Sequence, residues 1–224
     1  MRYNLRNSVL IRSENAAKSH LQKSAHLVGY LEKLPKVEIS LDYGCGKLRY
    51  LQEIMAISDH VVVVDSAVQL ERIQRLPGHK YCSIYDLAVL SNQWSVCTIK
   101  DISMHYGRYD AIFCLNVLQV VPLRKIRQSI LRRLFNALKH EGSCYICVQY
   151  RNSDFKRMIG LDYAKLYGDG MLLDSLRRHS FYGFISPNDL VELVSDSGFT
   201  VVDLELNQGS CYLTARKLTH TVGR

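Results

Sequence analysis

The sequence predicts an α/β fold, in which a mostly parallel sheet carries helices on both of its faces. Three observations lead to this prediction. Apolar segments with the length of strands alternate with segments of helical periodicity. One of them contains four consecutive valines at residues 61–64, which is typical of a parallel strand buried on both faces. Near the end, two strand-like segments flank the turn signal at 207–209, so the last strand is expected to be antiparallel.

The first elements are a helix, a strand and a second helix. Residues 14–33 have the spacing of an amphipathic helix, carried by Ala17, Leu21, Ala25, Val28 and Leu31. Pro35 closes this segment, and a strand follows at 37–43. A helix over 47–56 leads to the valine strand at 60–65.

The middle of the chain continues the alternation. A helix is predicted over 66–76, and a proline and a glycine directly after it stop the helix. Residues 79–94 have no clear period and stay ambiguous between helix and strand. Strands are predicted at 95–101 and, with a stronger pattern, at 109–117.

The last third contains one long helix and an irregular insert. Apolar residues four apart predict a helix over 122–140, which Gly142 is expected to end. A strand follows at 143–150, whereas 151–185 has no clean period. A serine cap followed by a proline starts the last helix, at 186–198. The closing hairpin consists of strands at 198–206 and 210–218.

Composition and charge narrow the function only slightly. The hydrophobic content of 47% and the charged content of 22% are typical of a globular protein. The net charge of +8 favours a polyanionic partner or, equally well, a solubilising surface. The first thirty residues lack a signal-type apolar core, and no apolar run approaches the ~20 residues of a membrane span. We therefore expect a soluble, cytoplasmic protein without a membrane partner.

The seven cysteines do not form a disulfide framework in this interpretation. Their number is odd and they are scattered, which suits a reducing compartment. The closest pair, Cys144 and Cys147, lies in a predicted strand, where residues three apart point to opposite faces. The two thiols therefore cannot share a metal ion, and we predict no metal site.

The loop Asp42-Tyr43-Gly44-Cys45-Gly46 follows the first strand of the sheet and is the main candidate binding site. Two glycines permit a tight turn and a close approach of a ligand to the backbone. The amides that open the next helix favour a carboxylate, and Asp42 can accept hydrogen bonds from a cationic amine. A nicotinamide dinucleotide fits less well, because an acid precedes the first glycine and Arg49 replaces the third.

A second acid indicates the other half of the ligand. Asp65 ends the valine strand, 19 residues after Gly46. An acid at this place can bind both hydroxyls of a ribose. A ligand with an amino-acid end and a ribose is therefore expected, and S-adenosylmethionine has both groups.

With these motifs the chain resembles the class I S-adenosylmethionine-dependent methyltransferases, over roughly residues 36–217. The resemblance implies a Rossmann-like, seven-stranded sheet. LDYGCGK resembles the glycine-rich motif of the family, VVVVDS the motif with the ribose acid, and YDAIFCLNVLQVVP the motif at the fourth strand. The segment LKHEGSCYICV is similar to the entry into the fifth strand, and the final hairpin to the sixth and seventh strands.

The resemblance implies a set of cofactor-binding residues. They are Asp42, Tyr43, Gly44, Cys45, Gly46, Asp65, Ser66, Asp101, Asn116, Val117 and Leu118. Asp101 would lie near the adenine amine, and Asp86 competes with it for this role. The family often has a third glycine where this chain has Leu48, which would reshape the methionine end of the pocket.

We expect one domain over residues 1–224 with four parts. These are an N-terminal helical segment, a cofactor-binding core, a substrate-lid insert, and the last helix with its hairpin, at 1–35, 36–150, 151–185 and 186–218. The insert interleaves cations with aromatics, which suits nucleotides, although the aromatics can equally pack on the sheet. Its members are Arg151, Phe155, Lys156, Arg157, Tyr163, Lys165, Tyr167, Arg177, Arg178, Phe181, Tyr182 and Phe184.

The implied activity is methyl transfer to an unidentified acceptor, either a small molecule or a nucleic-acid-derived group. The candidate catalytic residues are Tyr150, Arg151 and His179, although no obvious catalytic motif is present. The chain lacks the Asn-Pro-Pro-Tyr and Pro-Cys motifs of base-methylating enzymes and a three-cysteine radical cluster. The alternatives are an inactive, methyltransferase-like subunit that binds nucleic acid or acts as a scaffold, and, less favoured, a nicotinamide oxidoreductase. The sequence does not indicate the oligomeric state.

Overall fold

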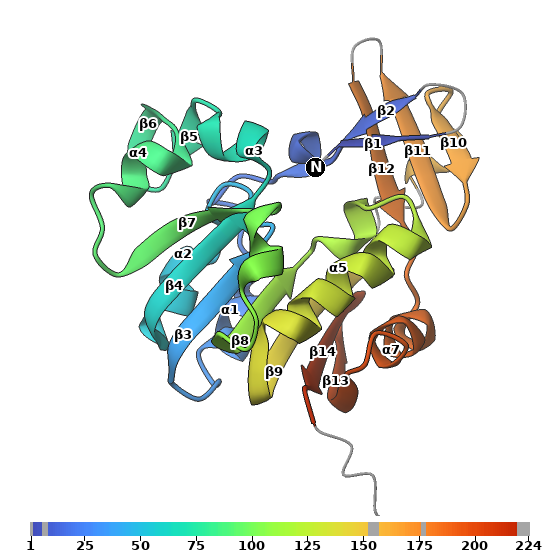
Figure 1. The fold of residues 1–224 in the computed structure, drawn as a ribbon. Helices are drawn as coiled ribbons and strands as arrows, with labels where there is room; N and C mark the ends of the chain where they lie inside the picture. Colours follow the sequence, from blue (N-terminus) through green and yellow to red (C-terminus); the bar gives the residue numbers. More distant parts are fainter. Residues whose placement is uncertain (1, 6–8, 152–156, 176–177, 219–224) are drawn as a thin grey trace, which may run out of the picture.

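A seven-stranded sheet forms the centre of the computed structural model, which describes residues 2–5, 9–151, 157–175 and 178–218. Figure 1 shows it between layers of helices. In spatial order its strands are β13 (Thr200–Asn207), β14 (Ser210–Arg216), β9 (Leu138–Gln149), β8 (Tyr109–Leu115), β3 (Val37–Tyr43), β4 (Ser58–Asp65) and β7 (Trp94–Thr98). Strand β14 is antiparallel to both of its neighbours, and the other neighbouring strands pair in parallel. The predicted fold class is confirmed.

The sheet separates two apolar cores, and the valine strand contributes to both. Val62 and Val64 belong to one core, and Val61 and Val63 to the other. The first core contains buried residues of α5 (Arg124–Ala137) and α7 (Pro187–Ser195), and the second contains those of α1 (Ala25–Leu31), α2 (Leu51–Ala56) and α3 (Ala67–Glu71). Burial on both faces is thus why the strand has no polar alternation.

The two neighbouring cysteines of β9 confirm the predicted alternation of strand side chains. Cys144 packs in the first core and Cys147 in the second. Among the described residues, no three His, Cys, Asp or Glu side chains are grouped so that they could hold a metal ion.

The N-terminal prediction is wrong in its first half. Helix α1 covers only Ala25–Leu31, because Ser24 caps it by accepting a hydrogen bond from the Leu27 amide at 3.3 Å. Before it, the chain forms β1 (Arg2–Asn4), β2 (Leu10–Arg12) and the 3₁₀ turn η1 (Ser13–Ala16). The apolar spacing continues back to residue 17, but residues 17–24 form an irregular segment with a turn, in which the Gln22 amide donates to the carbonyl of Ser19 at 3.0 Å.

The insert at 151–185 contains strands that the sequence did not predict. They are β10 (Ala164–Tyr167), β11 (Gly170–Ser175) and β12 (Arg178–Gly183), which form an antiparallel meander. Strand β12 also pairs with β2, so a second, five-stranded sheet joins the start of the chain to the insert (Figure 1). Phe155, Lys156 and Arg177 of the predicted cation and aromatic set lie outside the described residues.

Several further element boundaries differ from the prediction. The helix expected over 66–76 ends at Glu71, and a small hairpin of β5 (Gln74–Leu76) and β6 (His79–Cys82) precedes α4 (Ile84–Ala88). Helix α5 ends at Ala137 rather than at residue 140. Gly142 therefore lies within β9, where an added Cβ would come within 2.9 Å of Leu138.

None of the helices in the described part of the chain combines the length and apolarity that crossing a lipid bilayer requires.

The turn of the final hairpin gives a test of the fold. Gly209 has a φ of +81°, and a Cβ there would overlap the carbonyl oxygen of Arg151. Gly209→Ala is therefore expected to lower the free energy of unfolding by more than the ~1–2 kcal/mol of left-handed strain alone, measured by chemical denaturation. Gly78→Ala is the matched control, because Gly78 has a φ of +74° and no atom within 4 Å of such a Cβ. Equal losses in the two variants would contradict the packing argument.

Candidate functional site

The main cavity lies where the strand order reverses. Strand β3 has β4 on one side and β8 on the other, and the chain reaches β8 only after completing β4 and β7. Loops that follow the carboxyl ends of such strands diverge and leave a crevice between them. The cavity spans about 920 Å³, including the space open to solvent at its mouth. Its lining residues are Ser13, Glu14, Ala16, Ala17, Lys18, Asp42, Gly44, Cys45, Gly46, Lys47, Arg49, Tyr50, Asp65, Gln69, Leu115, Asn116, Val117, Gln119, Val120, Gln149 and Tyr182.

The loop after β3 requires a glycine at position 44 for two reasons, its backbone conformation and the lack of space for a side chain. Gly44 has a φ of +75°, and a Cβ there would lie 2.5 Å from a methyl group of Val117. The Gly44 backbone in the loop after β3 thus packs directly against the Val117 side chain in the loop after β8. Leu48, at the place of the family's third glycine, also has a positive φ, of +56°, and its side chain is buried in the second core. The left-handed backbone is therefore kept without a glycine, and Leu48 is not among the residues that line the cavity.

Asp65, at the end of β4, is held by backbone amides. It accepts hydrogen bonds from the amide of Gly46 at 3.0 Å and from that of Ser66 at 2.7 Å. Burial raises the pKa of this carboxyl group, and the two amide bonds offset part of the increase. The side chain of Gln69 donates to the carbonyl of Gly46 at 2.5 Å and so supports the same loop from α3.

Asp42 is the second carboxylate of the cavity. It is 5% exposed, and no described residue forms a hydrogen bond with its carboxyl group. Burial, followed by the nearby Asp65 charge, raises the pKa of Asp42 to about 7. Two buried carboxyl groups at neighbouring strand ends therefore favour a ligand that brings a cation and hydroxyl groups.

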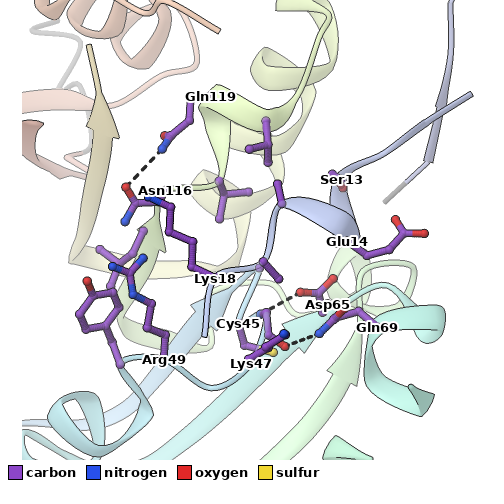
Figure 2. Close-up of a pocket in the computed structure, with 18 of the residues that line it drawn as sticks. Ser13, Glu14, Lys18, Cys45, Lys47, Arg49, Asp65, Gln69, Asn116 and Gln119 are labelled. Carbon is purple, nitrogen blue, oxygen red and sulfur yellow. Dashed lines mark hydrogen bonds between the residues drawn. The ribbon is translucent and has the colours of Figure 1, made fainter. Parts of the chain in front are cut away.

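Three cations line the cavity, and in the described residues none of them has an acidic partner. They are Lys18, Lys47 and Arg49. Figure 2 shows the side chains of Lys18 and Arg49 extending toward Asn116, away from Asp65. The cavity thus contains both buried acids and unpaired cations, as a zwitterionic ligand requires.

The opposite end of the cavity is neutral and rich in amides. Asn116 follows β8 with a φ of +62°, a conformation that asparagine tolerates better than most residues. Its side-chain oxygen accepts a hydrogen bond from Gln119 at 3.2 Å, which Figure 2 also shows. Across from them, the Tyr182 hydroxyl donates to Gln149 at the end of β9.

The structure brings most of the predicted cofactor residues to this cavity. Those that line it are Asp42, Gly44, Cys45, Gly46, Asp65, Asn116 and Val117. Tyr43 and Leu118 are fully buried in the first core instead. Tyr43 faces this core because alternate positions of β3 point to the same side of the sheet, and Leu118 belongs to the 3₁₀ turn that follows β8. Ser66 supports Asp65 through its amide and does not itself line the cavity.

The two acids considered for the adenine end both have local partners. Asp101 is exposed and accepts a hydrogen bond from Thr98 at 2.6 Å, and it borders a different, shallow hollow next to β7. Asp86 forms a reciprocal capping box with Ser83 at the start of α4. Neither of them lines the main cavity.

The candidate catalytic residues do not line the cavity. The amides of Tyr150 and Arg151 donate to the carbonyl of Gly209, at 2.9 and 3.0 Å. Both residues therefore lie next to the turn of the final hairpin. His179 lies on β12, opposite Asp174 of β11, with 3.0 Å between its Nδ1 and the carboxylate. None of the three is among the described residues that line the cavity.

Sequence reasoning missed the N-terminal part of the cavity lining and two glutamines. Residues of the segment 13–18 line the cavity, and Gln119 and Gln149 line its neutral end together with Tyr182, a residue of the predicted substrate-lid insert. Gln119 lies inside the LNVLQVVP motif, so the sequence could have indicated that it lies close to the cofactor-binding residues. The N-terminal residues offered no comparable signal, because their helical spacing favoured a helix.

Comparisons with known proteins agree with this geometry. A family model described as a methyltransferase domain matches residues 17–204. The uncharacterized protein YmfD of Escherichia coli (strain K12) is 33% identical over 214 residues, which cover 96% of this chain and 95% of YmfD.

Solved structures share the fold at lower identity. A protein from Pyrococcus horikoshii OT3 superposes with a TM-score of 0.67 and 15% identity, covering 88% of this chain and 93% of that chain. The 1,6-didemethyltoxoflavin-N1-methyltransferase of Burkholderia thailandensis, solved with 1,6-didemethyltoxoflavin and S-adenosylhomocysteine, has a TM-score of 0.55 and 20% identity. That match covers 92% of this chain and 79% of that chain. The resemblance found in the sequence is thereby confirmed, and the chain belongs to the methyltransferase-domain family, among the class I S-adenosylmethionine-dependent methyltransferases.

Proposed function

We propose that the protein transfers a methyl group from S-adenosylmethionine to a small-molecule acceptor. The observation that carries this proposal is the pair of buried carboxyl groups, Asp42 and Asp65, on either side of the glycine loop. S-adenosylmethionine is the cofactor, and its amino-acid end, ribose and sulfonium match the charges of this cavity. When bound, it supplies an activated methyl group and leaves as S-adenosylhomocysteine.

The residues present fit each polar part of the cofactor. Asp42, which has no hydrogen-bond partner among the described residues, accepts from the cationic amine. Asp65 accepts from the ribose hydroxyls, because backbone amides already hold its carboxylate in place. Lys18 and Arg49 receive the carboxylate of the amino-acid end.

The contribution of the protein to the reaction is positioning and exclusion of water. An activated methyl group needs an aligned nucleophile more than it needs a catalytic base. The neutral end of the cavity agrees with this, since its polar groups are the amides of Asn116, Gln119 and Gln149 and the phenol of Tyr182. We therefore assign no general base.

A small acceptor is supported over a nucleic acid by two features. The N-terminal segment and β12 both contribute residues to the lining of the cavity, so the strand ends are covered rather than open. In addition, two of the five cations of α5 are already paired within the protein, Arg124 with Glu192 at 3.2 Å and Arg127 with Asp169. The Burkholderia thailandensis enzyme with this fold is named as the N1-methyltransferase of 1,6-didemethyltoxoflavin, the compound bound in its structure.

The state of the cysteines supports a reducing location. All seven are free thiols, and five of them are buried. Unpaired cysteines are typical of proteins that act in the cytoplasm, where we place this enzyme.

Replacing the ribose acid tests the cofactor assignment. Asp65→Asn removes the charged acceptor of two hydroxyl hydrogen bonds, so affinity for S-adenosylhomocysteine should fall about 100-fold or more in titration calorimetry. Asp59→Asn is the matched control, because Asp59 is an exposed aspartate at the opposite end of the same strand. An Asp65→Asn variant that binds as tightly as the control would rule out this role.

The carboxyl group of Asp42 gives the binding a pH dependence. A bound amine favours the charged carboxylate, so cofactor binding lowers the pKa of Asp42 from about 7 and releases a proton. Affinity for S-adenosylhomocysteine should therefore rise about five- to tenfold between pH ~6 and pH ~7.5, below the usual pKa of an α-amino group. Asp42→Asn should bind more weakly and show a flat profile over this range. A flat profile for the unaltered protein would contradict the assignment.

A further inference from the structure

We propose that the acceptor is an uncharged small molecule that donates an N–H or O–H hydrogen bond to the side-chain oxygen of Gln119. This inference rests on the proposed function and assigns the substrate class of the same cavity. Gln119 then determines which acceptors bind productively, whereas the two carboxylates hold the cofactor.

The order of the strand ends locates the acceptor. Along the cavity the strands follow one another as β4, β3, β8 and β9. Asp65 at the β4 end takes the ribose, and the β3 loop takes the amino-acid end. The space that remains lies over β8 and β9, where Asn116, Gln119 and Gln149 line the cavity.

Gln119 lines this space and carries a hydrogen-bond acceptor that has no partner in the described part of the chain. The residue is only 2% exposed, and its Nε2 donates to Asn116 at 3.2 Å. The Oε1 atom is buried, so a ligand reaches it by a turn of the side-chain amide. Leaving such a group unsatisfied costs about 1–3 kcal/mol, so a ligand that donates to it recovers this energy.

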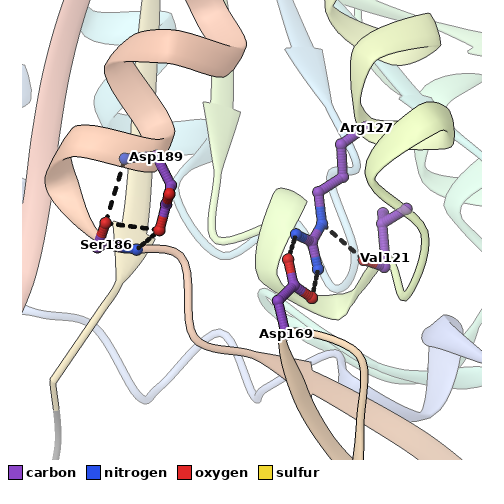
Figure 3. A network of polar contacts seen from close by, with 5 residues as sticks. All are labelled: Val121, Arg127, Asp169, Ser186 and Asp189. Atoms are coloured by element: carbon purple, nitrogen blue, oxygen red, sulfur yellow. Dashed lines mark hydrogen bonds and ion pairs between the residues drawn. The ribbon is translucent and has the colours of Figure 1, made fainter.

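The five-stranded sheet packs against the same neutral end of the cavity. Arg127 of α5 is buried, donates through Nε to the carbonyl of Val121 at 2.7 Å, and forms a two-pronged ion pair with Asp169 at the β10–β11 turn (Figure 3). A Cβ at Gly183 would lie 2.7 Å from Arg127 and 3.3 Å from the carbonyl of Gln119. Strand β12 therefore lies directly on the η3 turn (Leu118–Val120), which brings Tyr182 into the wall of the cavity.

The charges near this end favour an uncharged acceptor. The closest lining groups are amides and a phenol, and the acid on the N-terminal segment, Glu14, is paired with Arg2 at 3.3 Å. Lys18 and Arg49 are the remaining cations that point this way, and the cofactor carboxylate engages them (Figure 2). A charged acceptor would lose its hydration here without gaining a partner of opposite charge.

Isotope transfer tests the substrate class. The full-length protein is incubated with methyl-deuterated S-adenosylmethionine and the small-molecule filtrate of an Escherichia coli extract, the source of the 33% identical relative. The products are separated by ion exchange into neutral, anionic and cationic pools and analysed by mass spectrometry, with RNA and protein analysed apart. We expect the label in the neutral pool. Label confined to a charged pool, to RNA or to protein would overturn this inference and leave methyl transfer intact.

Variants of Gln119 test whether its side-chain oxygen binds the methyl acceptor. Gln119→Leu keeps the shape and removes the acceptor, so labelling should fall at least about tenfold while affinity for S-adenosylhomocysteine stays within about twofold. Gln119→Glu keeps an accepting oxygen and should label more than Gln119→Leu. The matched control Gln52→Leu, at an exposed position of α2, should behave like the unaltered protein.

The outcomes separate the two proposals. Equal loss of labelling and of S-adenosylhomocysteine binding in Gln119→Leu would show a role in the cofactor site or in folding and would contradict this inference. Absence of S-adenosylhomocysteine binding by the unaltered protein would refute the proposed function itself. Normal binding with no label in any pool would contradict both catalysis and the assigned acceptor class.

Discussion

The contact between Gly44 and Val117 is the constraint on which the site depends. It joins the loops that follow β3 and β8, and it leaves no room for a side chain between them. Gly44 and Val117 both line the cavity, so this contact fixes the distance between the two loops there. Asp42 and Asp65, at the ends of β3 and β4, line the same cavity and are both buried.

Burying two acids side by side is unfavourable unless a ligand compensates them. Amide groups from the glycine loop and from Ser66 stabilise Asp65 in advance, but Asp42 has no such support in the described residues. Part of the unfavourable electrostatics of the free protein therefore lies at Asp42, where we propose that the cationic amine of the cofactor binds. Gln119 is comparable, since its buried side-chain oxygen has no hydrogen-bond partner among the residues that the structure describes.

The sequence predicted the parts of the fold that follow from regular patterns. The strands of the central sheet and the acid at the end of β4 could be recognised, because periodicity and spacing fix them locally. The small sheet could not, since β2 and β12 pair across more than half of the chain, and β10 to β12 have no alternating pattern. The cap at Ser24 also overrode the helical spacing before it. Tyr150 and His179 were chosen for their chemistry, whereas their packing places them elsewhere.

The small sheet has one further consequence, which concerns how the two sides of the cavity are built. Its strands come from the two segments that stand outside the alternation of strands and helices, and in the described residues β2 and β12 share one paired position, Ile11 with His179. The segments that cover the cavity are thus different from those that carry Asp42 and Asp65. Substitutions in β12 would therefore alter the part of the lining formed by Tyr182 while both carboxyl groups at the strand ends stay in place.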